Sequence, residues 1–205
     1  MTVRCRVVLF VGVMVLFGLT APSALRADSC TNVNNLVANC GFETGTLSGW
    51  TFTPAGTGSV FYVRTDFGQS DAYSAAFGAV GGEDDYISQN LTTSPGGTYN
   101  IQFWLYTGVV AGDFFANWDG NQIYYTTGTA PGWTLYSFDE PVTGSVTTLE
   151  FGGQNAPAWY YLDDVSVCST STPCADNATP EPSSLSLLGI GLIGLAGLAK
   201  RKILA

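Results

Sequence analysis

The sequence predicts an all-β fold, a two-sheet antiparallel β-sandwich. Short runs rich in Val, Thr, Tyr, Phe and Trp alternate with clusters of Gly, Pro, Asn and Asp, which is typical of strands and turns. No segment between the two apolar ends of the chain has a sustained helical period with caps. About 150 residues separate those ends, which is the length of a single domain.

The candidate strands share this composition and are listed in chain order: 34–39, 59–64, 73–79, 85–90, 99–106, 113–118, 121–127, 134–140, 146–152 and 159–168. The run 99–106 shows the clearest alternation. Its inward set is Ile101, Phe103 and Leu105, and its other set is Asn100, Gln102, Trp104 and Tyr106. Because the second set is both polar and aromatic, it forms either a half-buried outer face or a sugar-binding platform.

The N-terminus has the pattern of a signal peptide. Arg4 and Arg6 precede an apolar stretch over 7–19, and the small-residue segment APSALRA follows. This order predicts cleavage near Ala27, so that residues 1–27 are removed and the working domain, 28–168, is exported. The alternative is an uncleaved N-terminal anchor.

The C-terminus has a second apolar segment. The run 185–199 has 15 residues, which is roughly 22 Å of helix against a hydrocarbon core of about 30 Å. Four glycines weaken it, and the basic residues of 200–202 follow it and are expected to stay cytoplasmic. We expect a linker at 169–179 and a transmembrane helix at 185–199 that acts as a transient address, with a permanent anchor as the alternative.

The exported segment keeps four of the five cysteines: Cys30, Cys40, Cys168 and Cys174. An oxidising compartment favours disulfides, and four cysteines allow three pairings. We favour the two local loops, Cys30–Cys40 and Cys168–Cys174. A zinc site is not expected, because the spacing fits no zinc motif and the chain has no histidine.

The charge distribution excludes several partners. Between residues 28 and 179, Arg64 is the one basic residue against fifteen acidic ones. Nucleic acid and anionic lipid surfaces are therefore excluded as partners, because both need a Lys/Arg surface. An acidic surface without lysine suits cation binding and contacts with neutral glycans.

Catalysis has few candidate groups. The absence of histidine removes the commonest general base and any Ser-His-Asp arrangement. Glycoside hydrolysis by a carboxylate pair stays open, because acidic residues occur in clusters. These residues are Glu83, Asp84, Asp85, Asp139, Glu140, Asp163 and Asp164. Since such clusters are usually solvated loops, we expect no enzyme and assign no catalytic residue.

Three stretches of the exported domain resemble a known family. NLVANCGFETGTLSGWTF (35–52), QNLTTSPGGTYNIQFWL (89–105) and YYLDDVSV (160–167) are similar, in this order, to the first strand, central hairpin and last strand of carbohydrate-binding modules of the galactose-binding, jelly-roll type. Cys40 departs from the pattern, because it stands where the family often has Gly. The resemblance implies a jelly roll whose first and last strands lie side by side.

The tail resembles a second known element. Pro180-Glu181-Pro182, a short Gly/Leu helix and the cluster Lys200-Arg201-Lys202 are similar to the PEP-CTERM sorting signal, residues 180–205. The resemblance implies recognition by exosortase, a membrane protease or transpeptidase. The protein would then be held transiently at the inner membrane before it reaches the cell surface, the extracellular matrix or the medium.

The carbohydrate-binding resemblance also implies a structural calcium ion between the first and last strands. The matching positions are Glu43 and one of Asp163 or Asp164, and hard oxygen ligands suit calcium. The alternative is that these acids cap turns or face solvent. Strict alternation in LDDVSV would bury one of the two aspartates, which then needs a partner.

Tryptophans beside turns are the candidate sugar contacts, because pyranose faces stack on aromatic rings. These residues are Trp118, Trp133 and Trp159. The sequence thus favours a non-catalytic surface or exopolysaccharide-matrix protein that binds polysaccharide. The alternatives are a structural or adhesive protein without a sugar site, and a glycoside-active enzyme.

Overall fold

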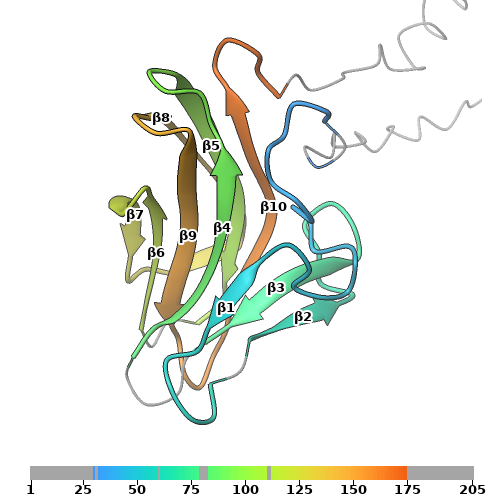
Figure 1. Ribbon diagram of the computed structural model, residues 1–205. Coiled ribbons are helices and arrows are strands. Elements are labelled where there is room, and N and C mark those ends of the chain that lie inside the picture. Colours follow the sequence, from blue (N-terminus) through green and yellow to red (C-terminus); the bar gives the residue numbers. More distant parts are fainter. Residues whose placement is uncertain (1–29, 31, 60, 79–82, 110–111, 175–205) are drawn as a thin grey trace, which may run out of the picture. The chain divides into compact units, whose positions relative to one another are not determined.

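A computed structural model describes residues 30, 32–59, 61–78, 83–109 and 112–174 (Figure 1). They all belong to Arg26–Thr179, which forms a compact unit of the chain. The predicted signal peptide, the predicted sorting tail and its transmembrane helix lie outside the described residues. The described part contains no helix with the length and apolar character needed to cross a membrane.

The unit is a sandwich of two antiparallel five-stranded sheets, as the sequence predicts (Figure 1). Sheet A has the order β1-β4-β9-β6-β7 and sheet B the order β2-β3-β10-β5-β8. The strands are β1 (Thr51–Thr53), β2 (Phe61–Thr65), β3 (Tyr73–Phe77), β4 (Asp85–Thr92), β5 (Thr98–Thr107), β6 (Asp113–Trp118), β7 (Asn121–Thr126), β8 (Ala130–Pro141), β9 (Val146–Gln154) and β10 (Tyr160–Ser169).

The core lies between the two sheets and follows from the alternation of each strand. In β5, every second residue from Tyr99 to Thr107 is buried and the residues between them are half-buried. Aromatic rings fill much of the space: Phe103 contacts Phe114 and Phe151 with centroid distances of 5.9 and 5.0 Å. Because this unit encloses its own hydrophobic core, we expect it to fold when it is produced alone.

Nine of the ten predicted strands are confirmed, and the run 34–39 is not a strand. The side chain of Asn35 makes hydrogen bonds there in place of regular backbone pairing between strands. Its Oδ1 accepts from Val37 N and from Val167 N, both at 3.0 Å. Asparagine competes with regular structure in this way because its amide imitates a peptide group. The segment still lies beside the last strand, since Leu36 N donates to Val167 O at 3.0 Å. The strand β1 has only three residues and was not predicted from the sequence.

The two aspartates of β10 do not follow the strict alternation expected from the sequence, because the strand has a β-bulge there. The pairing with β5 shifts between Asp163 and Ser166, and Asp164 has a φ of 47°, in the left-handed region. The extra residue lets Leu162 and Val165 both belong to the core. Neither aspartate has to enter the core, yet both are buried.

Both favoured disulfides are present, Cys30–Cys40 and Cys168–Cys174. The second one holds the start of the predicted linker against the domain. Thr170 N donates to Thr98 O at 2.9 Å, and Thr172 N to Ser169 O at 2.9 Å. Residues 169–174 are therefore part of the folded unit.

Candidate functional site

Trp118, one of the three predicted sugar contacts, is a core residue. It is the last residue of β6 and is 2% exposed. Its ring lies 6.3 Å from that of Tyr99, and its indole N–H donates to Pro141 O at 3.2 Å. The prediction was wrong because β6 carries Trp118 on the same face as Phe114 and Ala116, which point into the sandwich.

The outer face of sheet A carries a row of aromatic side chains across four strands. Tyr86 of β4 is opposite Gly152 of β9, Gly152 is opposite Phe115 of β6, and Phe115 is opposite Tyr125 of β7. Gly152 has no side chain, so the Tyr86 and Phe115 rings meet above it, 5.5 Å apart between centroids. Tyr125 is 54% exposed. We call Tyr86, Phe115 and Tyr125 the aromatic row.

Polar side chains border the aromatic row on one side. Ser88, Glu150 and Asn117 are opposite one another on β4, β9 and β6. Asn117 Nδ2 donates to Glu150 Oε1 at 2.9 Å. One step further along the strands, Thr148 donates to Asn90 Oδ1 at 2.8 Å. The border therefore presents carboxylate, amide and hydroxyl groups that can bond sugar hydroxyls.

Two carboxyl groups border the row on its other side. Asp84 precedes β4, and Asp113 is the first residue of β6. Burial, followed by repulsion from Asp113, raises the pKa of Asp84 to about 6. Asp84 is therefore partly protonated near that pH.

The other two predicted sugar contacts, Trp133 and Trp159, are half-buried on the outer side of sheet B. Trp133 packs against Phe67 and Tyr106, with centroid distances of 5.9 and 5.8 Å. Trp159 packs edge-on against Tyr62 at 5.1 Å. Neither residue belongs to the aromatic row, which lies on the opposite sheet.

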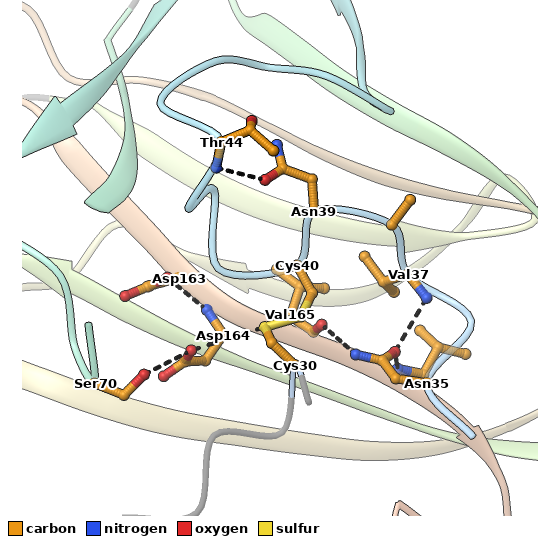
Figure 2. The surroundings of a disulfide bond; sticks show 12 residues. Cys30, Asn35, Val37, Asn39, Cys40, Thr44, Ser70, Asp163, Asp164 and Val165 are labelled. Carbon is orange, nitrogen blue, oxygen red and sulfur yellow. Dashed lines mark hydrogen bonds between the residues drawn. A yellow bond between two sulfur atoms is a disulfide. The ribbon is translucent and has the colours of Figure 1, made fainter. Parts of the chain in front are cut away.

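The aspartates of the β10 bulge lie between Ser70 and the segment that contains Cys40 (Figure 2). Asp163 is 1% and Asp164 4% exposed. Asp163 accepts from Gln69 N at 2.6 Å and from Asp164 N at 2.8 Å. Asp164 Oδ1 accepts from the Ser70 hydroxyl at 3.0 Å. Burial first, and repulsion by Asp164 second, raise the pKa of Asp163 to about 8.

Glu43 is close enough to add to the rise in the pKa of Asp163. It lines a hollow of about 390 Å³ beside the Cys30–Cys40 disulfide, and its Oε1 accepts from Tyr73 N at 2.9 Å. Within the described ranges, no three His, Cys, Asp or Glu side chains are grouped so that they alone could hold a metal ion. A cation at the two aspartates would therefore need other oxygen atoms as well.

Sequence comparison identifies the tail. Residues 178–202 match the PEP-CTERM protein-sorting motif, which includes all six predicted sorting residues: Pro180, Glu181, Pro182, Lys200, Arg201 and Lys202. This confirms the resemblance seen in the sequence. No curated protein sequence matches the chain.

Solved structures resemble the folded unit. The structure of TmCBM61 in complex with beta-1,4-galactotriose has a TM-score of 0.54 at 19% identity, over 66% of this chain and 98% of that one. The C-terminal family 22 carbohydrate binding module of Clostridium thermocellum Xyn10B has a TM-score of 0.52 at 14% identity, over 69% and 99%. The enzymatically active domain of bacteriophage CBA120 tailspike protein 4 has a TM-score of 0.53 at 14% identity, over 66% and 21%. These likenesses establish a carbohydrate-binding-module-like jelly roll.

The aromatic row was not predicted from the sequence. Its members lie on three separate strands, and none is a tryptophan. The alternation of 85–90 and 113–118 did contain a signal. In each strand the aromatic residue, Tyr86 or Phe115, is next to a core residue, Ile87 or Phe114, and therefore lies on the outer face. What the sequence did not contain was the order of the strands in the sheet.

Proposed function

We propose that this chain is an exported, non-catalytic protein that binds neutral glycan on the outer face of sheet A. Exosortase would release it from the inner membrane to the cell surface or into a polysaccharide matrix. The aromatic row is the observation that carries the proposal. It offers apolar ring faces for pyranose stacking, with hydroxyl, amide and carboxylate groups on one side and two carboxyl groups on the other.

Asp84 and Asp113 are the carboxyl groups of this face that the glycosidase alternative would use. Glycosidases separate their two carboxyl groups by about 5 to 9.5 Å, to leave room for the sugar or a water molecule. The charge of Asp113 is near enough to add to the effect of burial on the pKa of Asp84, so hydrolysis has to be tested directly. Release of reducing sugar from any glycan that the protein binds would favour the glycosidase alternative.

Phe115→Ala is expected to weaken glycan binding about tenfold, because the ring supplies a central stacking surface. Affinity is measured by isothermal titration calorimetry on residues 26–179. The probes are β-1,4-galactotriose and xylohexaose, both neutral and β-linked. Gly152→Ala should weaken binding as well, since a Cβ there would lie 2.3 Å from Phe115 Cζ and displace the ring.

Trp159→Ala is the matched control and should bind like the wild type, because it removes a half-buried aromatic side chain from the outer side of the other sheet. Binding that is equal in the wild type and Phe115→Ala would contradict the site. A wild type that binds neither these probes nor other neutral β-glycans would favour the structural or adhesive alternative.

We also propose a structural calcium ion at the β10 bulge. Asp163 and Asp164 are two adjacent buried carboxyl groups, and the described residues place no Lys or Arg side chain in an ion pair with Asp163. Burial of like charges is costly unless a cation compensates it. Asp163, Asp164 and Glu43 would hold the ion through oxygen atoms, with the Ser70 hydroxyl beside them.

Processing of the tail can be tested on the protein in its native host. We expect the mature chain to end near Pro180-Glu181-Pro182, because the extended Pro-Glu-Pro segment is accessible to a membrane protease. Mass spectrometry of surface or matrix material should then lack peptides from 185–205. A C-terminal peptide that still contains LAKRKILA in most of the mature protein would show that the tail is a permanent anchor.

A further inference from the structure

Arg64 is the single basic residue between residues 28 and 179, and it lies in an aromatic setting. It belongs to β2, at the opposite side of the sandwich from the aromatic row. Its guanidinium carbon is 4.7 Å from the ring centroid of Phe67 and 5.2 Å from that of Tyr161. Its Nη1 donates to the Tyr161 hydroxyl at 2.6 Å. The cation is therefore fixed against two π faces.

The position of the Phe67 ring is set by the loop between β2 and β3. Phe67 N donates to Ala72 O at 3.3 Å, and the Ser74 hydroxyl donates to Phe67 O at 2.7 Å. The turn needs Gly68, because a Cβ there would lie 2.4 Å from Asp71 O. Since the loop is closed by its own bonds, the setting of Arg64 exists before any ligand arrives.

Two more rings extend this setting across sheet B. Tyr106 is opposite Tyr161 on the neighbouring strand, and its ring lies 5.1 Å from Phe67. Trp133 contacts both Tyr106 and Phe67. We call Arg64, Phe67, Tyr106, Trp133 and Tyr161 the arginine cradle. All of its members except Tyr161 are half-buried, so part of each side chain is accessible.

The charge of Arg64 is not neutralised within the described residues. The Tyr161 hydroxyl is the one hydrogen-bond acceptor that these residues offer it, and none of their carboxylates forms an ion pair with it. A guanidinium has five N–H donors in a planar fork that matches a carboxylate. Donors therefore remain for an anionic ligand, in a partly desolvated place where such a bond is strong.

We propose that the arginine cradle is a second glycan site, which takes a sugar that carries a carboxylate, such as a uronic acid residue. The carboxylate would bond the Arg64 fork, and the pyranose ring would lie against Trp133 and Tyr106. This site goes beyond the neutral-glycan face and does not depend on it. A short ligand is favoured over a long polyanion, because the rest of the exported domain is strongly acidic.

The test is calorimetric titration of residues 26–179 with trigalacturonate and with its carboxyl-reduced, neutral counterpart. Chelator is present in both titrations so that calcium cannot bridge the carboxylates. We expect the wild type to bind the charged trimer more tightly. Arg64→Gln should weaken that binding about tenfold or more. The affinity of Arg64→Lys for the charged trimer should lie between those of the wild type and Arg64→Gln, because lysine keeps the charge and loses the planar fork.

Two controls separate this site from the aromatic row and from a role in stability. Phe115→Ala should leave trigalacturonate binding unchanged, and Arg64→Lys should keep the thermal unfolding temperature of the wild type. The proposal is overturned if the wild type does not bind the charged trimer or binds both trimers equally. It is also overturned if Arg64→Gln binds like the wild type, if Phe115→Ala abolishes binding, or if sulfated trisaccharides bind more tightly than trigalacturonate.

Discussion

Trp118→Ala is expected to lower the free energy of unfolding by about 3 to 5 kcal/mol, the range for removal of a large aromatic side chain from a core. The side chain is almost fully buried at the end of β6. Its removal would leave a cavity beside Tyr99 and deprive Pro141 O of the indole N–H. Both losses act on the folded state alone, so the whole sandwich loses stability.

Urea denaturation of residues 26–179 followed by far-UV circular dichroism measures this effect, since the signal does not depend on the deleted fluorophore. Trp133→Ala is the matched control, because the same change is made at a half-buried residue and should cost clearly less. Equal losses in the two variants would mean that Trp118 is not a core residue. A Trp118→Ala variant that is as stable as the wild type would also show that Trp118 is not a core residue.

Calcium is expected to raise the unfolding temperature of the same segment by about 5 to 10 °C at a concentration 100-fold above its Kd. An ion that binds only the folded state stabilises it by RT ln(1 + [L]/Kd), about 2.7 kcal/mol at that concentration. The physical source is the compensation of the buried Asp163 and Asp164 carboxylates by a divalent cation. Calorimetry in millimolar calcium and in chelator measures the difference.

Asp163→Asn and Glu43→Ala should each remove most of this calcium response, because each deletes a charged oxygen donor. Asp119→Asn is the control: Asp119 is exposed and has a φ of 52°, a conformation that asparagine tolerates. Melting curves that coincide in calcium and chelator would contradict the site. A response that survives both substitutions would place the ion elsewhere.

The local features of the fold were readable from the sequence. Alternation identified the core positions of β5, since Ile101, Phe103 and Leu105 are all fully buried. Short cysteine spacings favoured the disulfide pairing that is observed. The sorting motif was also local, because it lies in one continuous segment. These features depend on neighbours in the chain, so a pattern of period two or a short spacing is enough to predict them.

The features that depend on partners in space were not readable. Residues 34–39 look like a strand, but the Asn35 side chain bonds to β10 instead. Trp118 and Trp133 both border turns in the sequence. The packing of the two sheets buries Trp118 in the core and leaves Trp133 half-exposed. The β10 bulge moved both aspartates out of strict alternation.

The sequence alone was therefore enough to predict the class of fold, the sorting motif and the acidic, histidine-free chemistry. Which side chains act together depends instead on how the strands pair and pack. The aromatic row exists because strand order places Tyr86, Phe115 and Tyr125 across four strands with Gly152 between two of them. The arginine cradle exists because β2, β5 and β10 share one sheet. Strand order is set by contacts between residues far apart in the chain, and the composition of one strand does not specify which strand will pair with it.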